Sequence, residues 1–234
     1  MESQRARQIH LLEEQAREKG EFTEALKFAE EALVAYVEDD DLLGAAEVLA
    51  AQVLIYRHLF EKTEKKAFLL LAEVAATKSV RMAGESGQPE ALAIPNHTLG
   101  KVYEDMGKWQ EAVAAQQKAI EITTTTPPAS HNRPAFLAEI RTHLFADKYM
   151  AGDKSALTGL DEAIVALEGE TVELKYNRDV WLSGGYMSKA KVLKADNPAM
   201  AKEAMQKAKA VIDANSELTL RKQQWEKLAK EIPV

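Results

Sequence analysis

Stretches with the apolar spacing of amphipathic helices recur along the whole chain, separated by Gly, Pro or Asp residues. They group into pairs whose first helices are predicted to begin near residues 3, 41, 89, 133 and 172, at spacings of roughly 38 to 48 residues. Helix pairs repeated at this period are typical of solenoids, in which each pair packs on its neighbours. No run alternates apolar and polar residues as a half-buried strand would. We therefore expect an all-α fold.

Short turns mark the corners inside the predicted pairs, as at Gly20, Gly107 and Gly152. Because these turns leave little room between consecutive helices, each pair is expected to be antiparallel. The five pairs are predicted at about 3–38, 41–83, 89–122, 133–167 and 172–212, and a final capping helix at 217–231, all in one domain spanning 1–234.

The segments between the pairs carry recognisable start and stop signals. Asp39 to Asp41 suits a loop that ends in an N-cap, and Asn197 followed by Pro198 predicts an N-cap with proline at the first helical position. Thr123 to Pro128 contains four threonines and two prolines, which make a poor helix. We expect that segment to be an extended connector.

Composition narrows the classes of function. The chain has no cysteine, which excludes disulfides, thiolate catalysis and cysteine-based metal sites. A net charge of −7 argues against a protein that binds duplex nucleic acid. The N-terminus lacks an apolar signal region, and no stretch approaches the roughly 18 apolar residues of a membrane span. We expect a cytoplasmic protein with no membrane partner.

The charge is distributed unevenly. Residues 1–40 contain eleven acidic and five basic residues, whereas residues 186–234 contain ten basic and six acidic residues. These ends could be ordinary solvated helix faces, or they could steer a partner or drive association into a homodimer or a structural subunit.

The third pair carries the most specific motif. Leu-Gly, an aromatic residue, Gly, a second aromatic residue and two alanines follow one another at fixed offsets, and this pattern resembles the tetratricopeptide repeat. Each position has a packing role, since small residues let two helices approach closely and aromatic residues fill the space around them. The motif residues are Leu99, Gly100, Tyr103, Gly107, Trp109, Ala112 and Ala119.

Other pairs hold weaker copies of the motif. The first pair keeps Gly20, Phe22, Ala25, Ala29 and Ala32, and the fifth keeps Ala201, Met205 and Ala208. The long spacing is most similar to the extended repeats of kinesin light chains and of many bacterial regulatory proteins. This resemblance implies a right-handed superhelical solenoid of five helix pairs plus the cap.

The resemblance also implies a non-enzymatic scaffold that binds a protein or peptide in a groove lined by the first helix of each pair. The groove positions taken from the motif and from helix facing are His97, Lys101, Glu104, Arg141, His143, Asn177 and Trp181. The Lys and Asn set with which some relatives grip the C-terminal carboxylate of chaperones is absent, because His10, Glu14, His97 and Lys101 occupy its positions. We expect no such clamp.

No catalytic, cofactor or metal motif is present. The five histidines lack a compact ligand spacing, and no phosphate-binding Gly-rich loop occurs. Gly184 and Gly185 are unusual inside a predicted helix, because each costs about 1 kcal/mol relative to alanine. Either a neighbouring helix crosses closely beside Trp181 and Tyr186, or a ligand approaches the bare backbone there, as in a ligand-responsive regulator.

Overall fold

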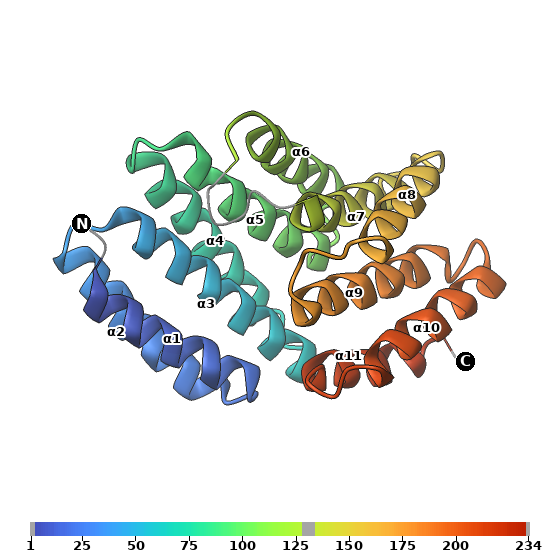
Figure 1. Cartoon of the computed structure of the whole chain (residues 1–234), viewed down its shortest axis with the longest axis horizontal. Coiled ribbons are helices and arrows are strands. Elements are labelled where there is room, and N and C mark those ends of the chain that lie inside the picture. The colour runs from blue at the N-terminus through green and yellow to red at the C-terminus, as the bar shows by residue number, and fades with distance from the viewer. Residues whose placement is uncertain (1–2, 128–133, 233–234) are drawn as a thin grey trace. The chain divides into compact units, whose positions relative to one another are not determined.

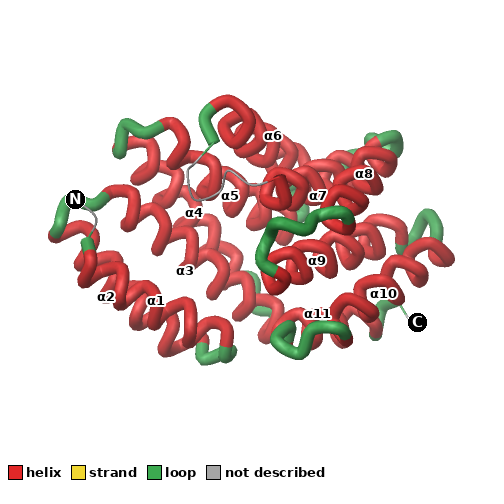
Figure 2. The backbone as a smooth tube through the Cα atoms, in the orientation of Figure 1, coloured by secondary structure: helices red, strands yellow, loops and turns green. Residues whose placement is uncertain are grey.

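A computed structural model describes residues 3–127 and 134–232, and all regular structure in these two ranges is helical (Figures 1 and 2). The all-α expectation is confirmed. The chain divides into two compact units, Met1–Ser130 and His131–Val234, which are described separately as unit 1 and unit 2. That the chain forms one domain, and that its superhelix is right-handed, stay predictions.

Unit 1 holds three helix pairs in two layers. The first helices α1, α3 and α5 contact one another in succession, and α2 and α4 each pack on the first helix of the next pair. The second helices therefore form a layer of their own. The elements are α1 (Gln4–Glu18), α2 (Phe22–Glu38), α3 (Leu42–Thr63), α4 (Ala67–Glu85), the 3-10 turn η1 (Pro89–Leu92), α5 (Ala93–Asp105) and α6 (Trp109–Thr125).

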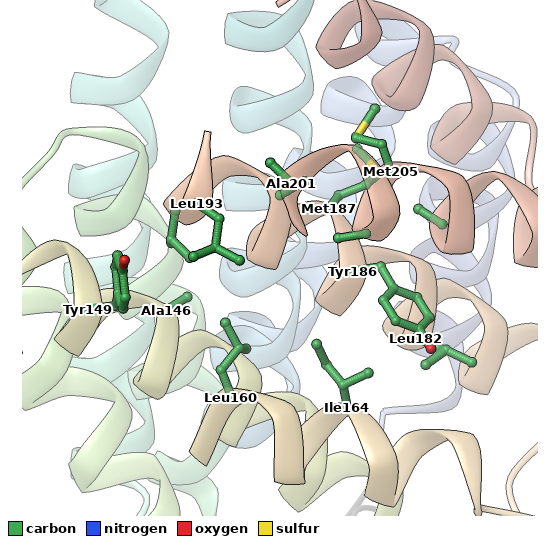
Figure 3. Packing of buried hydrophobic residues seen from close by; sticks show 14 of the residues in the cluster. Ala146, Tyr149, Leu160, Ile164, Leu182, Tyr186, Met187, Leu193, Ala201 and Met205 are labelled. Carbon is green, nitrogen blue, oxygen red and sulfur yellow. The ribbon is translucent and has the colours of Figure 1, made fainter. Parts of the chain in front are cut away.

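Unit 2 holds two pairs and a final helix around one apolar core. Leu160 and Ile164 of α8 point toward α9, whose Leu182 and Tyr186 belong to the same cluster (Figure 3). The elements are α7 (Pro134–Met150), α8 (Ala156–Glu168), α9 (Lys175–Leu193), α10 (Pro198–Asp213) and α11 (Thr219–Ala229). Arg133, where the fourth pair was expected to begin, lies outside the described residues.

The last helix covers the edge of this core, as the sequence predicted. Leu228 and Ile232 are 6% exposed and belong to the core cluster of unit 2. Trp225 packs against the same cluster, and its Nε1 donates to the carbonyl of Met205 at 2.9 Å. A capping helix with one apolar face is what a stack of helix pairs needs at its end.

The predicted helix starts are confirmed by their hydrogen bonds. The side chain of Asp41 accepts the backbone N–H of Gly44 at 2.9 Å, and that of Asn197 accepts the N–H of Met200 at 3.2 Å. The connector predicted from Thr123 was wrong for its first three residues, which continue α6 to Thr125. Each of their hydroxyls donates to the carbonyl four residues earlier, so that the β-branched side chains bond within the helix. Pro128 lies outside the described residues.

One helix corrects the expectation about apolar length. Helix α3 is long and apolar enough to cross a membrane, which the residue count had not suggested. In the structure 56% of its apolar window is buried, and the helix packs on α1, α2, α4 and α5. The apolar composition of α3 is therefore explained by its central position in unit 1.

Candidate functional site

The motif residues of the third pair serve its packing. Gly107 has a φ of +72°, which favours glycine at the corner between α5 and α6. Ala112 and Ala119 are fully buried. A Cβ on Gly100 would lie 2.5 Å from Nε2 of Gln116, so the glycine makes room for that buried side chain. These contacts explain why the spacing of the motif predicted the hairpin.

The first pair has the large and the small residue of this helix interface in exchanged positions. Gly100 and Gln116 correspond to Glu13 and Ala29, each 87 residues earlier in the chain. All of these positions are buried, but in the first pair the large polar side chain comes from the first helix and the small residue from the second. One polar side chain therefore occupies this position of the interface in both pairs.

A histidine accompanies the polar side chain in each pair. His97 Nδ1 lies 2.7 Å from Oε1 of Gln116, and at the equivalent position His10 Nε2 lies 3.7 Å from Oε2 of Glu13. Burial, with the charges of Arg7 and Arg17, lowers the pKa of His10 to about 4. Burial raises the pKa of Glu13, although Arg17 donates to its Oε1 at 3.0 Å and opposes that shift. Both histidines are structural parts of the hairpins.

Two ion pairs link the first helices of unit 1. Arg7 Nη1 of α1 lies 3.2 Å from a carboxylate oxygen of Glu47 on α3. Arg57 Nε of α3 lies 2.5 Å from Oδ2 of Asp105 on α5, and both side chains are largely buried. Burial alone would lower the pKa of Arg57, but Asp105 raises it, so the guanidinium stays charged. These pairs connect α1 to α3 and α3 to α5.

Two of the three predicted groove residues of unit 1 are accessible. Lys101 and Glu104 on α5 are partly exposed, and Nζ of Lys101 lies 3.4 Å from Nε2 of His97. His97 itself is 4% exposed and is held between α5 and α6 by its contact with Gln116. The accessible side chains of α1, α3 and α5 are called the first-helix surface of unit 1 below.

The other four predicted groove residues belong to unit 2. Arg141 on α7 is exposed, and Nε2 of His143 lies 3.5 Å from Oε1 of Glu139 one turn earlier. On α9, Asn177 donates to Oε1 of Glu173 at 2.9 Å, and the ring of Trp181 lies 6.2 Å from that of Phe136 on α7. The accessible side chains of α7 and α9 are called the first-helix surface of unit 2.

Close helix packing accounts for Gly185, the second of the two glycines inside α9. A Cβ on Gly185 would lie 3.3 Å from Ile164 of α8 and 3.4 Å from Thr142 of α7, and one on Gly184 would lie 3.4 Å from the guanidinium of Arg221. Tyr186 is 5% exposed, and its hydroxyl donates to Glu168. Side chains thus fill the space beside the glycines where a ligand was the alternative.

Sequence reasoning missed the most elaborate charge cluster of unit 2. Asp179 is 3% exposed and accepts from Lys175 at 2.5 Å, Arg178 at 2.9 Å and Nδ2 of Asn215 at 3.0 Å. Burial alone would raise the pKa of Asp179, but these donors hold it below its usual value. The cluster ties the start of α9 to the turn before α11. Only the adjacent basic residues hinted at it, since Asn215 lies 36 residues away.

With this geometry established, comparison with known proteins decides the family of the repeat. Residues 97–126 match the family model for the tetratricopeptide repeat. This segment is a tetratricopeptide repeat. The match covers α6 and most of α5, which form the hairpin with the clearest motif. No curated protein matches the sequence.

Solved structures share this tetratricopeptide fold at low sequence identity. A Podosopora anserina protein described as a putative kinesin light chain with nearly identical TPR-like repeats is 18% identical, with a TM-score of 0.56 over 90% of this chain and 96% of that one. A variant of that protein gives 0.57, at 18% identity over 91% and 97%. BtubC (BKLC) from P. vanneervenii gives 0.60, at 18% identity over 89% and 77%. The likeness concerns the fold.

Proposed function

We propose that this tetratricopeptide repeat protein is a non-enzymatic scaffold that binds a protein or peptide on the first-helix surfaces of its units. Folds of this type generally serve as protein-interaction scaffolds. The observation that carries the proposal is that packing and accessibility belong to different side chains of the repeats. Gly100, Ala112 and Ala119 of the motif are buried between helices, whereas Lys101, Glu104 and Arg141 remain accessible on first helices.

Both basic residues can be tested by charge reversal. Lys101→Glu and Arg141→Glu are expected to reduce capture of the partner from lysate, each on the surface of its own unit, and the double variant is expected to abolish it. Reversing a charge that faces an oppositely charged partner costs affinity and slows association. The measurement is quantitative mass spectrometry of proteins retained by the immobilised chain.

The matched control is Lys118→Glu with Lys202→Glu, which reverses two exposed lysines on the second helices α6 and α10. Circular dichroism of every variant verifies that the helices remain. Equal capture by the double variant, the control and the original chain would reject the first-helix surfaces as the binding site.

A further inference from the structure

Helix α4 has two apolar faces, and only one of them is covered. Leu69, Ala72 and Ala76 are buried. On the opposite side Leu70, Leu71 and Val74 are 57%, 45% and 51% exposed. Single exposed apolar residues are common, but neighbouring ones on one helix face mark an interaction surface.

Exposed cations continue the apolar face of α4. Lys78 lies one turn beyond Val74, Arg81 follows on the same side, and Lys66 precedes the apolar residues. All three are exposed, and none forms an ion pair with any of the residues that the structure describes. A partner for this face should therefore bring apolar side chains together with carboxylates.

Helix α2, in the same layer of unit 1, offers that chemistry. Val34 and Val37 are 56% and 52% exposed, and Glu30, Glu31 and Glu38 lie within one turn of Val34. Glu31 has no ion pair within the described ranges, and Glu38 has only a surface contact of 3.6 Å with Arg5. Surface pairs of that kind contribute little to stability and leave the carboxylate available.

We propose that a second copy of the chain packs on this layer about a two-fold axis, with α2 of each copy against α4 of the other. A two-fold interface uses the same surface twice, so one acidic and one basic helix in a single layer satisfy both halves. Pairing α4 with α4 would instead bring Lys78 and Arg81 near like charges, which is unfavourable. This interface is distinct from the first-helix surfaces and goes beyond the scaffold function.

The oligomeric state in solution tests the proposal directly. The full chain should sediment at twice its 25.9 kDa mass. Leu71→Glu with Val74→Glu should give a monomer, whereas the control Lys202→Glu with Lys222→Glu, which reverses two exposed lysines of unit 2, should leave the dimer intact. A monomer at every concentration of the original chain, or a dimer that persists in the Leu71 and Val74 variant, would overturn the interface.

A charge exchange tests which helices meet. Lys78→Glu with Arg81→Glu on α4, and Glu31→Lys with Glu38→Lys on α2, should each weaken self-association by about tenfold or more. Mixing the two variants should restore a dimer, because both contacts of the mixed pair are then complementary. Circular dichroism verifies that each variant is folded. Stronger self-association of the Lys78 and Arg81 variant would instead indicate α4 against α4, and failure of the mixture to associate would equally contradict the proposed pairing.

Discussion

At the scale of single residues, the volume shared by Gly100 and Gln116 decides how α5 packs on α6. Gly100→Ala would place a methyl group 2.5 Å from the buried amide of Gln116, and this crowding should cost about 1–3 kcal/mol of unfolding free energy. Adding Gln116→Ala should remove the crowding, so the double variant should be more stable than the sum of the single effects predicts. Urea unfolding measures all three variants.

Gly84→Ala is the matched control, because a Cβ there meets nothing within 4 Å. It should leave stability unchanged or raise it by up to about 1 kcal/mol through helix propensity. Additive effects of the Gly100 and Gln116 substitutions would show that the two side chains do not share one space.

His10 should make the stability of unit 1 depend on pH. Its pKa is about 4 in the folded chain against 6.5 for an unperturbed histidine, so only the unfolded chain binds the proton between these values. The contribution of His10 to the free energy of unfolding is therefore fully retained above pH 6.5. It decreases as the pH falls toward 4, by at most about 3 kcal/mol. His10→Asn should reduce this decrease in urea unfolding measured across that range.

The control for His10 is His58→Asn, which changes a partly exposed histidine on α3. Because Glu13 has a raised pKa, its own contribution has the opposite sign: stability is present at low pH and decreases as the pH rises. An identical pH dependence in the His10 variant and the original chain would contradict the assignment.

At the scale of helices, Asp179 should hold the start of α9 to the turn that precedes α11. Asp179→Asn leaves Lys175 and Arg178 without their buried carboxylate, and the loss should be about 2–4 kcal/mol. Thermal unfolding measures it, with the exposed Asp213→Asn as the control. The pKa of Asp179 is lowered in the folded chain. The difference in stability between the variant and the original chain should therefore shrink as the pH falls through this lowered pKa. A loss no larger than that of the control would show that the cluster is not stabilising.

The helices themselves could be predicted from short-range patterns. Gly20 and Gly107 mark corners because both adopt positive φ, and Asn197 marks a helix start through its own side chain. Thr123 to Thr125 were wrongly predicted to lie outside the helix. Helix propensity is a weak guide where threonine hydroxyls can form hydrogen bonds inside the helix.

The contacts of the candidate site could be predicted only in part. His97 was correctly placed on a first helix, but its bond to Gln116 depends on the rotation of both helices, and an error of one residue turns a side chain by about 100°. Arg57 and Asp105 form an ion pair although they lie 48 residues apart in the sequence, and no local sequence pattern predicts such a pair. Distant partners require the packing of the helices to be known first.

At the scale of the whole molecule, unit 2 should fold without unit 1. It contains its own apolar cluster from α7 to Ile232, and α11 covers the edge of that cluster. Residues 131–234 expressed alone should give a helical circular dichroism spectrum and one cooperative thermal transition. Deleting residues 217–234 from that fragment should lower the transition temperature or abolish it, because Leu228 and Ile232 leave the core. A fragment without a cooperative transition would show that unit 2 depends on unit 1.

The reversed placement of the buried polar side chain restricts how segments of this protein can be recombined. A chimera joining α1 to α6 would bring Glu13 and Gln116 into a space that holds one of them, and one joining α5 to α2 would leave Gly100 facing Ala29 across an empty volume. The helices of these two pairs are therefore interchangeable only as complete hairpins, so for them the hairpin is the smallest unit that duplication, grafting or design could transfer intact.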